Sequence, residues 1–335
     1  MTILVTGGAG YIGSHTVITL LEQDVDVIVL DNLVNSSVES LSRVSKICGR
    51  KPIFYQGDVL DRSCLKHIFS KHNIDSVIHF AGLKSVGESV EKPIEYYQNN
   101  VTGSLVLLEE MLAANVNKLI FSSSATVYGD PEFVPLTENA RIGGTTNPYG
   151  SSKVMVEEIL KDFSLANPDF SITALRYFNP VGAHSSGLIG EDPNGKPSNL
   201  LPIVTQVAIG ILSKLVIYGN DYPTIDGTGV RDYIHVMDLA EGHLCALNKL
   251  NAGFNAYNLG TGIGYSVLQV ITEFERITRK KIPFEIAERR PGDIAECWAS
   301  SALAHTELGW KAKLNLTDML QDAWRWQRMN PNGYD

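Results

Sequence analysis

A tyrosine and a lysine four residues apart have the spacing of a proton-transfer pair. Tyr149 and Lys153 lie in the stretch PYGSSKVMVEEIL. If this stretch is helical, residues four apart share one face, so the two side chains are neighbours. A lysine ammonium beside a phenol favours the phenolate, because it stabilises the charged form. The pair therefore predicts a general base at Tyr149.

Three consecutive serines offer a further hydrogen-bonding group. The stretch LIFSSSATVYG predicts an apolar strand that ends near Ser122, Ser123 and Ser124. Substrates commonly bind beyond the carboxyl ends of such strands. A serine hydroxyl there can hydrogen-bond the reacting oxygen and pass a proton toward Tyr149. The chemistry of serine does not choose among the three, and turn formation would also explain them.

The start of the chain predicts a phosphate-binding loop. A strand-like segment leads into TGGAGYIG, in which Gly7, Gly10 and Gly13 follow the pattern G-x-x-G-x-x-G. Glycine permits a tight turn and lets backbone N–H groups approach a pyrophosphate, and the N-terminus of the following helix favours the anion. A glycine triplet by itself is a weak signal, but the strand–loop–helix context predicts dinucleotide binding.

An aspartate at the end of the second predicted strand selects between two dinucleotides. Asp31 can accept hydrogen bonds from the adenine ribose hydroxyls, whereas its charge would repel a 2′-phosphate, and no arginine directly follows it. This favours NAD over NADP. The charged nicotinamide ring would add to the effect of Lys153 on Tyr149. Asp58 follows the third predicted strand. It would either reach the adenine or serve as an ordinary turn residue.

Alternating strands and helices must position these residues. Short apolar runs predict buried parallel strands, and the longer amphipathic stretches between them predict helices. The alternation predicts an α/β fold with a Rossmann-like, doubly wound parallel sheet. The predicted strands are Thr2–Thr6, Val25–Asp31, Pro52–Gly57, Asp75–Phe80, Lys118–Ser123 and Ser171–Tyr177, and the helices between them include Tyr11–Gln23 and Leu60–Lys71.

A second, smaller lobe is expected after Phe178. The segment NPVGAHSSGLIGEDPNGKPSN is rich in glycine, proline and asparagine, and a loop this long is typical of a segment that covers a ligand. Apolar segments follow at 200–212 and 214–218, and 316–327 predicts an amphipathic helix. We expect an NAD-binding domain over 1–178, with a return segment near 234–260, and a smaller α/β substrate-binding domain over 179–335. The two would share one cleft.

Bulk properties exclude several classes of protein. The 335 residues are 44% hydrophobic, which is enough for a large core. Lys and Arg number 28 against 37 Asp and Glu, a net charge of −9, so nucleic-acid binding is not expected. Cys48, Cys64, Cys245 and Cys297 form no CxxC pair, so we expect no disulfide framework and no metal site. Without a signal-like or membrane-length segment, we expect a cytoplasmic protein that does not bind membranes.

These motifs together resemble the extended short-chain dehydrogenase/reductase family, and within it most closely the UDP-hexose 4-epimerases. The resemblance implies an NAD-dependent isomerase of galactose metabolism that interconverts UDP-galactose and UDP-glucose, forms a homodimer and retains NAD as a prosthetic group. It covers essentially the whole chain through TGGAGYIGSHT, DNLVNSS, HFAGLKSVGESV, NNVTGSL, FSSSATVYGD, PYGSSK, RYFNPVGAH, GNDYPTIDGTGVRDYIHVMDLA and YNLGTG.

The resemblance also implies the roles of individual residues. Tyr149 would take the proton of the sugar 4-hydroxyl while C4 passes a hydride to NAD, Lys153 would lower the pKa of Tyr149, and Ser124 would assist. The flat 4-keto sugar would turn over and receive the hydride on its opposite face. Together with the glycine loop, the implied NAD contacts are Gly7, Gly10, Tyr11, Ile12, Gly13, Asp31, Asn32, Asn35, Ser36, Asp58, Val59, Phe80, Ala81, Lys84 (to ribose hydroxyls), Asn99, Ser124, Tyr149, Lys153 and Phe178.

Substrate contacts are implied mainly in the second lobe. Arg231 and Arg290 suit a diphosphate, because guanidinium binds phosphate bidentately, although surface ion pairs are the commoner role of an arginine. Tyr218 would stack near uracil, or belong to the core as strand aromatics usually do. The full implied set is Ser124, Tyr149, Asn179, Asn199, Leu200, Tyr218, Arg231, Arg290, Asp293 and Cys297.

Cys297 bears on the choice of sugar. In the 4-epimerases that it resembles, the matching position lines the pocket beside the C2 substituent. A tyrosine there crowds out an N-acetyl group, whereas a small cysteine leaves room, so UDP-N-acetylglucosamine and UDP-N-acetylgalactosamine are also expected to be interconverted. The alternative is that Cys297 is an ordinary buried thiol.

Other activities fit the residues less well. The nucleotide-sugar 4,6-dehydratases share the fold and the Tyr–Lys pair but carry Thr-Asp-Glu where this chain has Ser124, Ala125 and Thr126. Without a carboxylate there, elimination is disfavoured, and decarboxylating relatives similarly keep a glutamate at the position of Thr126. Retention of both Tyr149 and Lys153 argues against a non-enzymatic NAD-binding regulator. Tightly held NAD would exclude a dehydrogenase that exchanges its cofactor.

Overall fold

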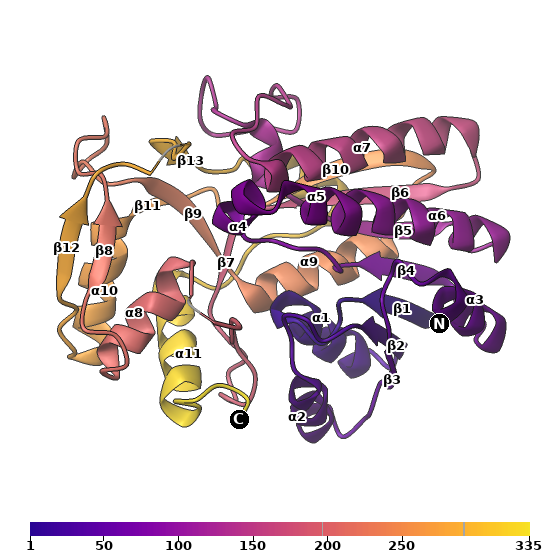
Figure 1. The fold of residues 1–335 in the computed structure, drawn as a ribbon, viewed down its shortest axis with the longest axis horizontal. Helices are drawn as coiled ribbons and strands as arrows, with labels where there is room; N and C mark the ends of the chain where they lie inside the picture. Colours follow the sequence, from indigo (N-terminus) through magenta and orange to yellow (C-terminus); the bar gives the residue numbers. More distant parts are fainter. Residues whose placement is uncertain (196, 291) are drawn as a thin grey trace.

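Seven parallel strands form the central sheet of the computed structural model, which describes residues 1–195, 197–290 and 292–335 (Figure 1). The strand order β10-β6-β5-β4-β1-β2-β3 confirms the predicted Rossmann-like sheet. Six of the strands agree with the predicted ranges to within one residue at each end. Their bounds are β1 Thr2–Thr6, β2 Asp26–Asp31, β3 Ile53–Gln56, β4 Ser76–His79, β5 Lys118–Ser124, β6 Ser171–Tyr177 and β10 Gly253–Leu259.

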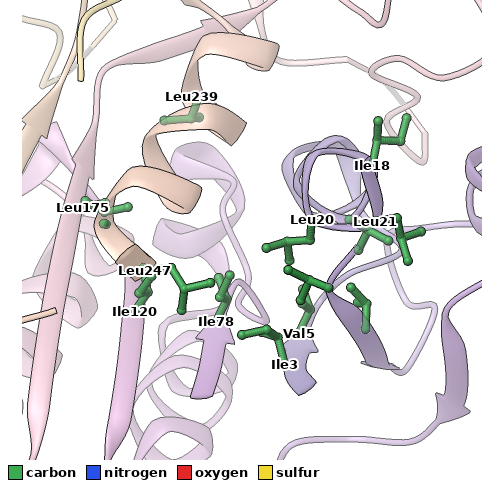
Figure 2. Close-up of a cluster of buried hydrophobic side chains, with 14 of the residues drawn as sticks. Ile3, Val5, Ile18, Leu20, Leu21, Ile78, Ile120, Leu175, Leu239 and Leu247 are labelled. Atoms are coloured by element: carbon green, nitrogen blue, oxygen red, sulfur yellow. The ribbon is translucent and has the colours of Figure 1, made fainter. Parts of the chain in front are cut away.

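Helices cover both faces of this sheet. Figure 2 shows one face, where α1 and α9 pack aliphatic side chains such as Leu20 and Leu239 against Val5 of β1 and Ile120 of β5. Burial of each such Leu or Ile stabilises the fold by roughly 1.5–3 kcal/mol. The core on this face includes α1 (Tyr11–Glu22), α2 (Val38–Cys48) and α9 (Val236–Asn248), and the opposite core includes α3 (Arg62–Lys71), α6 (Gly103–Ala113) and α7 (Pro148–Ala166).

Capping residues set where the helices begin. Asp61 accepts hydrogen bonds from the backbone N–H groups of Ser63 and Cys64, so α3 begins at Arg62 and not at the predicted Leu60. Asn147 accepts from the N–H of Gly150 at 2.8 Å and thereby starts α7, the helix of the Tyr–Lys pair. The predicted end of α1 at Gln23 is one residue too late, because Gln23 is the C-cap.

The second half of the chain returns to the sheet before it completes the smaller lobe. Helix α9 packs on α1, and β10 pairs in parallel with β6 at the edge of the sheet. The elements of the smaller lobe are β7 Asn179–Val181, α8 Leu200–Ala208, β8 Leu215–Tyr218, β9 Val230–His235, β11 Gly264–Ser266, α10 Val267–Thr278, β12 Phe284–Ala287, β13 Glu296–Cys297 and α11 Leu316–Met329. The remaining short helices are α4 Val86–Glu91, α5 Pro93–Tyr96, η1 Tyr97–Thr102, η2 Ala125–Tyr128 and η3 Ala304–Leu308.

The smaller lobe has its own hydrophobic core. Strand β9 pairs with β7, β11 and β13, while β8 and β12 form a separate two-stranded sheet. Side chains of α8, α10 and α11, among them Val204, Phe274 and Met319, are fully buried together. The apolar segment predicted over 200–212 is helical only as far as Ala208, and the predicted helix at 316–327 extends to Met329.

The strand order locates the cleft. The chain leaves β1 toward β2 and leaves β4 toward β5, although β1 and β4 are neighbours. Ligands of open α/β sheets bind outside the carboxyl ends of the strands at such a switch point. Among the helices of the described residues, none is both long and apolar enough to cross a membrane.

Candidate active site

One cavity of about 330 Å³ lies at this switch point and collects most of the predicted site residues. Its walls come from the ends of six sheet strands, from α7 and from the long loop after β7. The predicted residues that line it are Gly7, Gly10, Tyr11, Ile12, Gly13, Asp31, Asn32, Asn35, Ser36, Val59, Phe80, Ala81, Lys84, Asn99, Ser124, Tyr149, Lys153, Phe178, Asn179 and Asn199.

Among the residues that the structure describes, seven predicted site residues do not line this cavity. Asp58 is nearby, where its carboxylate accepts hydrogen bonds from the Asn32 side chain at 2.8 Å and from the N–H of Leu60 at 2.9 Å. The other six belong to the smaller lobe: Leu200, Tyr218, Arg231, Arg290, Asp293 and Cys297.

Close backbone approach explains two of the loop glycines. Gly7 has a φ of +72°, and a Cβ there would lie 2.6 Å from the backbone N of Ala81. A Cβ on Gly13 would collide with the carbonyl oxygen of Gly7. Gly10, which has no side chain to cap the helix, precedes the first turn of α1. The N–H groups of that turn lack intrahelical partners, so the loop has the donors and the space that a pyrophosphate requires.

Asp31 does more than the sequence predicted. Its side chain is buried, and it accepts hydrogen bonds from the N–H of Ala9 at 2.9 Å, the N–H of Leu33 at 2.9 Å and the hydroxyl of Ser36 at 2.8 Å. The carboxylate therefore ties the glycine loop to the end of β2. Because a carboxylate offers about four acceptor sites, capacity remains for a ribose hydroxyl.

The predicted helical face brings Tyr149 and Lys153 together. Both line the cavity from the first turns of α7, and the Lys153 ammonium lies 5.9 Å from the centre of the Tyr149 ring. Lys153 also donates a hydrogen bond to the backbone carbonyl of Ser122 at 2.6 Å. This bond joins α7 to the end of β5 and fixes the ammonium beside the phenol.

The structure distinguishes the three serines. Alternate residues of a strand face opposite sides of the sheet, so Ser122 and Ser124 line the cavity while Ser123 turns away and donates to Glu157 at 2.6 Å. The Ser124 hydroxyl accepts hydrogen bonds from Thr126, at 3.3 Å from its N–H and 3.0 Å from its hydroxyl. Ser124 also acts on the phenol of Tyr149 in the direction that lowers its pKa, whereas the hydroxyl of Tyr177 hydrogen-bonds His243.

Burial dominates the electrostatics of this pair. It raises the pKa of Tyr149 above its ordinary value, and the hydrogen bond from Ser124 acts in the lowering direction. Burial lowers the pKa of Lys153 to about 8, against a raising effect of the Glu157 charge. For the Tyr149 phenol, desolvation outweighs the lowering effect of Ser124. That Lys153 and a nicotinamide ring together lower the pKa of Tyr149 stays a prediction. The positive charge of a nicotinamide ring would act in the lowering direction.

The predicted substrate residues of the smaller lobe form two groups. In the first, the Arg290 guanidinium lies 4.2 Å from the centre of the Tyr218 ring and pairs with Asp293 at 3.4 Å. In the second, Cys297 of β13 is paired with Arg231 of β9. Arg231 donates to the carbonyl of Val230 at 2.8 Å. Tyr218 is therefore a partner of Arg290 at the surface and not a core aromatic.

Cys297 belongs to an apolar cluster beside the cavity. It is buried with Ala125 and Phe178, and Phe178 itself lines the cavity. Burial raises the pKa of its thiol to about 11, so the thiol is uncharged near neutral pH. Cys297 therefore contributes a small, neutral surface to this wall.

The structure adds residues that the sequence did not single out. Glu191, Asp192 and Pro193 line the cavity from the long loop after β7. The glycine- and proline-rich composition indicated that this loop covers a ligand, but no local pattern distinguished its carboxylates. Lys196 of the same loop lies outside the described residues. The described chain holds no group of three or more His, Cys, Asp or Glu arranged to bind a metal ion.

Comparison with known proteins identifies close relatives. The model of the NAD dependent epimerase/dehydratase family matches residues 3–260. A protein of Yersinia enterocolitica named UDP-glucose 4-epimerase is 80% identical over 335 residues, which are 100% of both chains. The structure of the UDP-glucose 4-epimerase from Bifidobacterium longum with NAD+ and UDP is 56% identical, has a TM-score of 0.97 and is matched over 99% of this chain and 100% of that one.

One structural relative bears on the range of sugars. The UDP-Glc/GlcNAc 4-epimerase from Campylobacter jejuni is 37% identical to this chain, with a TM-score of 0.85. The match covers 98% of this chain and 99% of that one. The name of that protein gives it both UDP-Glc and UDP-GlcNAc as sugars.

Proposed function

We propose, because this chain belongs to the NAD dependent epimerase/dehydratase family, that it is an isomerase that interconverts UDP-galactose and UDP-glucose through NAD held in the cleft. The observation that carries the proposal is the meeting of Tyr149, Lys153 and Ser124 in one cavity with the glycine loop. Relatives of this identity, matched from end to end, bear the same named activity.

The residues present fit an NAD molecule. The space kept by Gly7 and Gly13 and the first turn of α1 suit its pyrophosphate, and Asp31 suits the adenine ribose. Lys84 and Phe178 line the same cavity as Tyr149. Bound NAD supplies a hydride acceptor and donor for C4 of the sugar.

Proton transfer is the part of the reaction that belongs to the chain. Tyr149 takes the proton from the sugar 4-hydroxyl and later returns it, which contributes about 10²–10⁴-fold to the rate. Ser124, which lines the cavity with Tyr149, orients the phenol and the sugar oxygen. The ammonium of Lys153 stabilises the phenolate from a position fixed by the Ser122 carbonyl.

The smaller lobe binds the UDP-hexose. Asn179 and Asn199 lie on the cavity, while Arg231 and Arg290 supply positive charge for the diphosphate from β9 and the segment after β12. Asp58 supports the cofactor side through Asn32. In this division, 1–178 together with 234–260 forms the NAD-binding domain, and the rest of 179–335 forms the substrate domain.

Dehydration is not favoured as an alternative. Elimination of water needs an acid and a base beside the sugar, and the residues from the end of β5 onward are Ser124, Ala125 and Thr126. Ser124 and Thr126 hydrogen-bond each other at 3.0 Å and carry no charge.

The protein forms a homodimer in the cytoplasm. Large apolar side chains are exposed on the adjacent helices α5, α6 and α7 (Figure 1), including Ile94 at 71% and Leu165 at 79%. Exposed apolar side chains of this kind are available for a subunit interface to cover. All four cysteines lie in the described chain and are free, as a reducing compartment permits. Light scattering on the purified protein tests the dimer, and a wild-type monomer would refute it.

The direct test is incubation of the purified protein with UDP-galactose and no added NAD. We expect UDP-glucose to form until the two sugars reach equilibrium, because NAD copurifies and is regenerated in each turnover. Absence of product would reject the proposed activity. Product formation only with added NAD would instead reject the retained cofactor.

A further inference from the structure

The loop between β7 and α8 brings one carboxylate into the cleft. The Glu191 side chain is only 9% exposed and lines the cavity. Its Oε1 atom accepts a hydrogen bond from the Nζ of Lys84 at 3.3 Å and another from the Nδ2 of Asn199 at 2.7 Å. One oxygen therefore joins two residues that are far apart in the chain.

These two partners come from opposite sides of the cleft. Lys84 follows β4 in the sheet domain, and Asn199 is the N-cap residue of α8 in the smaller lobe. An N-cap asparagine commonly accepts a hydrogen bond from its own helix. Asn199 makes no such bond within the described helix, and its amide group is directed to Glu191 instead.

The backbone of Glu191 is held independently of this ion pair. Its carbonyl accepts a hydrogen bond from the indole of Trp326 at 3.1 Å. The next residue, Asp192, accepts from the N–H of Tyr334 at 2.9 Å, and the Tyr334 hydroxyl donates to the carbonyl of Gly190 at 3.2 Å. The C-terminal segment thus anchors the loop on both sides of Glu191, so the carboxylate has a defined position in the cleft.

We propose that Glu191 is a positioning residue that couples retention of NAD to binding of the UDP-hexose, by holding Lys84 and Asn199 with one carboxylate. The inference rests on the proposed function, in which Lys84 contacts the cofactor ribose and Asn199 the substrate. Ordering two flexible side chains before a ligand binds reduces the entropy lost on binding. When Lys84 or Asn199 is displaced from Glu191, the hydrogen bond between Glu191 and the remaining partner also changes.

The test compares Glu191→Ala and Glu191→Gln in the purified full-length holoenzyme. Three quantities are measured: the fraction of NAD retained after prolonged gel filtration, the Kd of UDP by calorimetry, and KM and kcat for UDP-galactose. We expect Glu191→Ala to lose NAD faster and to raise KM and the Kd of UDP by about tenfold, with a smaller change in kcat. Glu191→Gln should rescue these in part, because its carbonyl oxygen still accepts hydrogen bonds.

Glu241→Ala is the matched control. The Glu241 carboxylate also pairs with a lysine, Lys313 at 2.6 Å, but outside the residues that line the cavity. It should leave all three quantities unchanged. The inference is overturned if Glu191→Ala keeps wild-type NAD retention, Kd and KM, if it binds more tightly, or if its melting temperature alone changes. An inactive wild type that retains no NAD would instead reject the proposed function itself.

Discussion

Arg176 on β6 binds Glu157 on α7 through two parallel hydrogen bonds, with Nε to Oε1 at 3.0 Å and Nη2 to Oε2 at 2.7 Å. Both side chains are buried, at 2% and 0% exposed. Ser123 donates to the same carboxylate, and Arg176 donates to the hydroxyl of Tyr128 at 2.9 Å. Glu157 lies one turn after Lys153, so the pair fixes the Tyr–Lys helix against the sheet.

Breaking this pair from one side should destabilise the protein. Glu157→Gln leaves the guanidinium buried without its counter-charge, which is expected to cost roughly 3–5 kcal/mol of unfolding free energy. Urea unfolding followed by circular dichroism measures it. Replacing both residues by methionine should restore most of the stability, because no unpaired charge remains. A Glu157→Gln variant as stable as wild type would contradict the assigned role.

The same variant should change the pH dependence of activity. The charge of Glu157 raises the pKa of Lys153, which burial has lowered to about 8. Without that charge the pKa falls further, the ammonium is lost at a lower pH, and the alkaline limb of kcat/KM moves to lower pH. The double methionine variant should show the same shift despite its restored stability. Ser123→Ala keeps the charge of Glu157 and should not shift the alkaline limb. Equal pH profiles in wild type and all three variants would refute the effect of the Glu157 charge on Lys153.

Tyr149→Phe should retain NAD and lose turnover. The phenol oxygen is the proton acceptor, while the cofactor cleft depends on other residues, so kcat should fall about 10²–10⁴-fold. Absorbance of the released dinucleotide and conversion of UDP-galactose measure the two effects. Near wild-type turnover in the purified variant would show that another group is the base.

The dinucleotide released on denaturation should be NAD and not NADP. The buried Asp31 carboxylate at the end of β2 would repel a 2′-phosphate. Chromatography of the released nucleotide identifies it. Recovery of mostly NADP would reject the ribose argument at Asp31.

Wild type should also interconvert UDP-N-acetylglucosamine and UDP-N-acetylgalactosamine. Cys297 contributes a small side chain to the cluster that includes Phe178 on the cavity wall. Cys297→Tyr should suppress the N-acetyl reaction and leave glucose–galactose exchange largely intact. Equal loss of both reactions, or no N-acetyl activity in wild type, would reject Cys297 as the determinant.

The sequence by itself determined six strands of the parallel sheet, the glycine loop and the shared face of Tyr149 and Lys153, whereas it did not identify β10. Each of these depends on a local property: apolar runs bury strands, glycine admits a tight backbone turn, and a four-residue spacing aligns side chains on a helix. Each of these properties depends on residues that are close together in the chain, so a sequence pattern is enough to predict it. The exact ends of helices depended on capping bonds, such as that of Asp61, and were predicted less well.

Only the tertiary structure decided which of the three serines face the cavity, how Asp31 binds the glycine loop, and that Glu191 joins Lys84 to Asn199. Ser124 lines the cavity and Ser123 does not, because successive residues of β5 face opposite sides of the sheet. Glu191 contacts Lys84, which is more than a hundred residues away in the chain, and Asn199 at the start of α8. These contacts exist only after the two lobes have packed together. No local pattern encodes such contacts, because hydrogen bonds and burial depend on distances in space and not on separation along the chain.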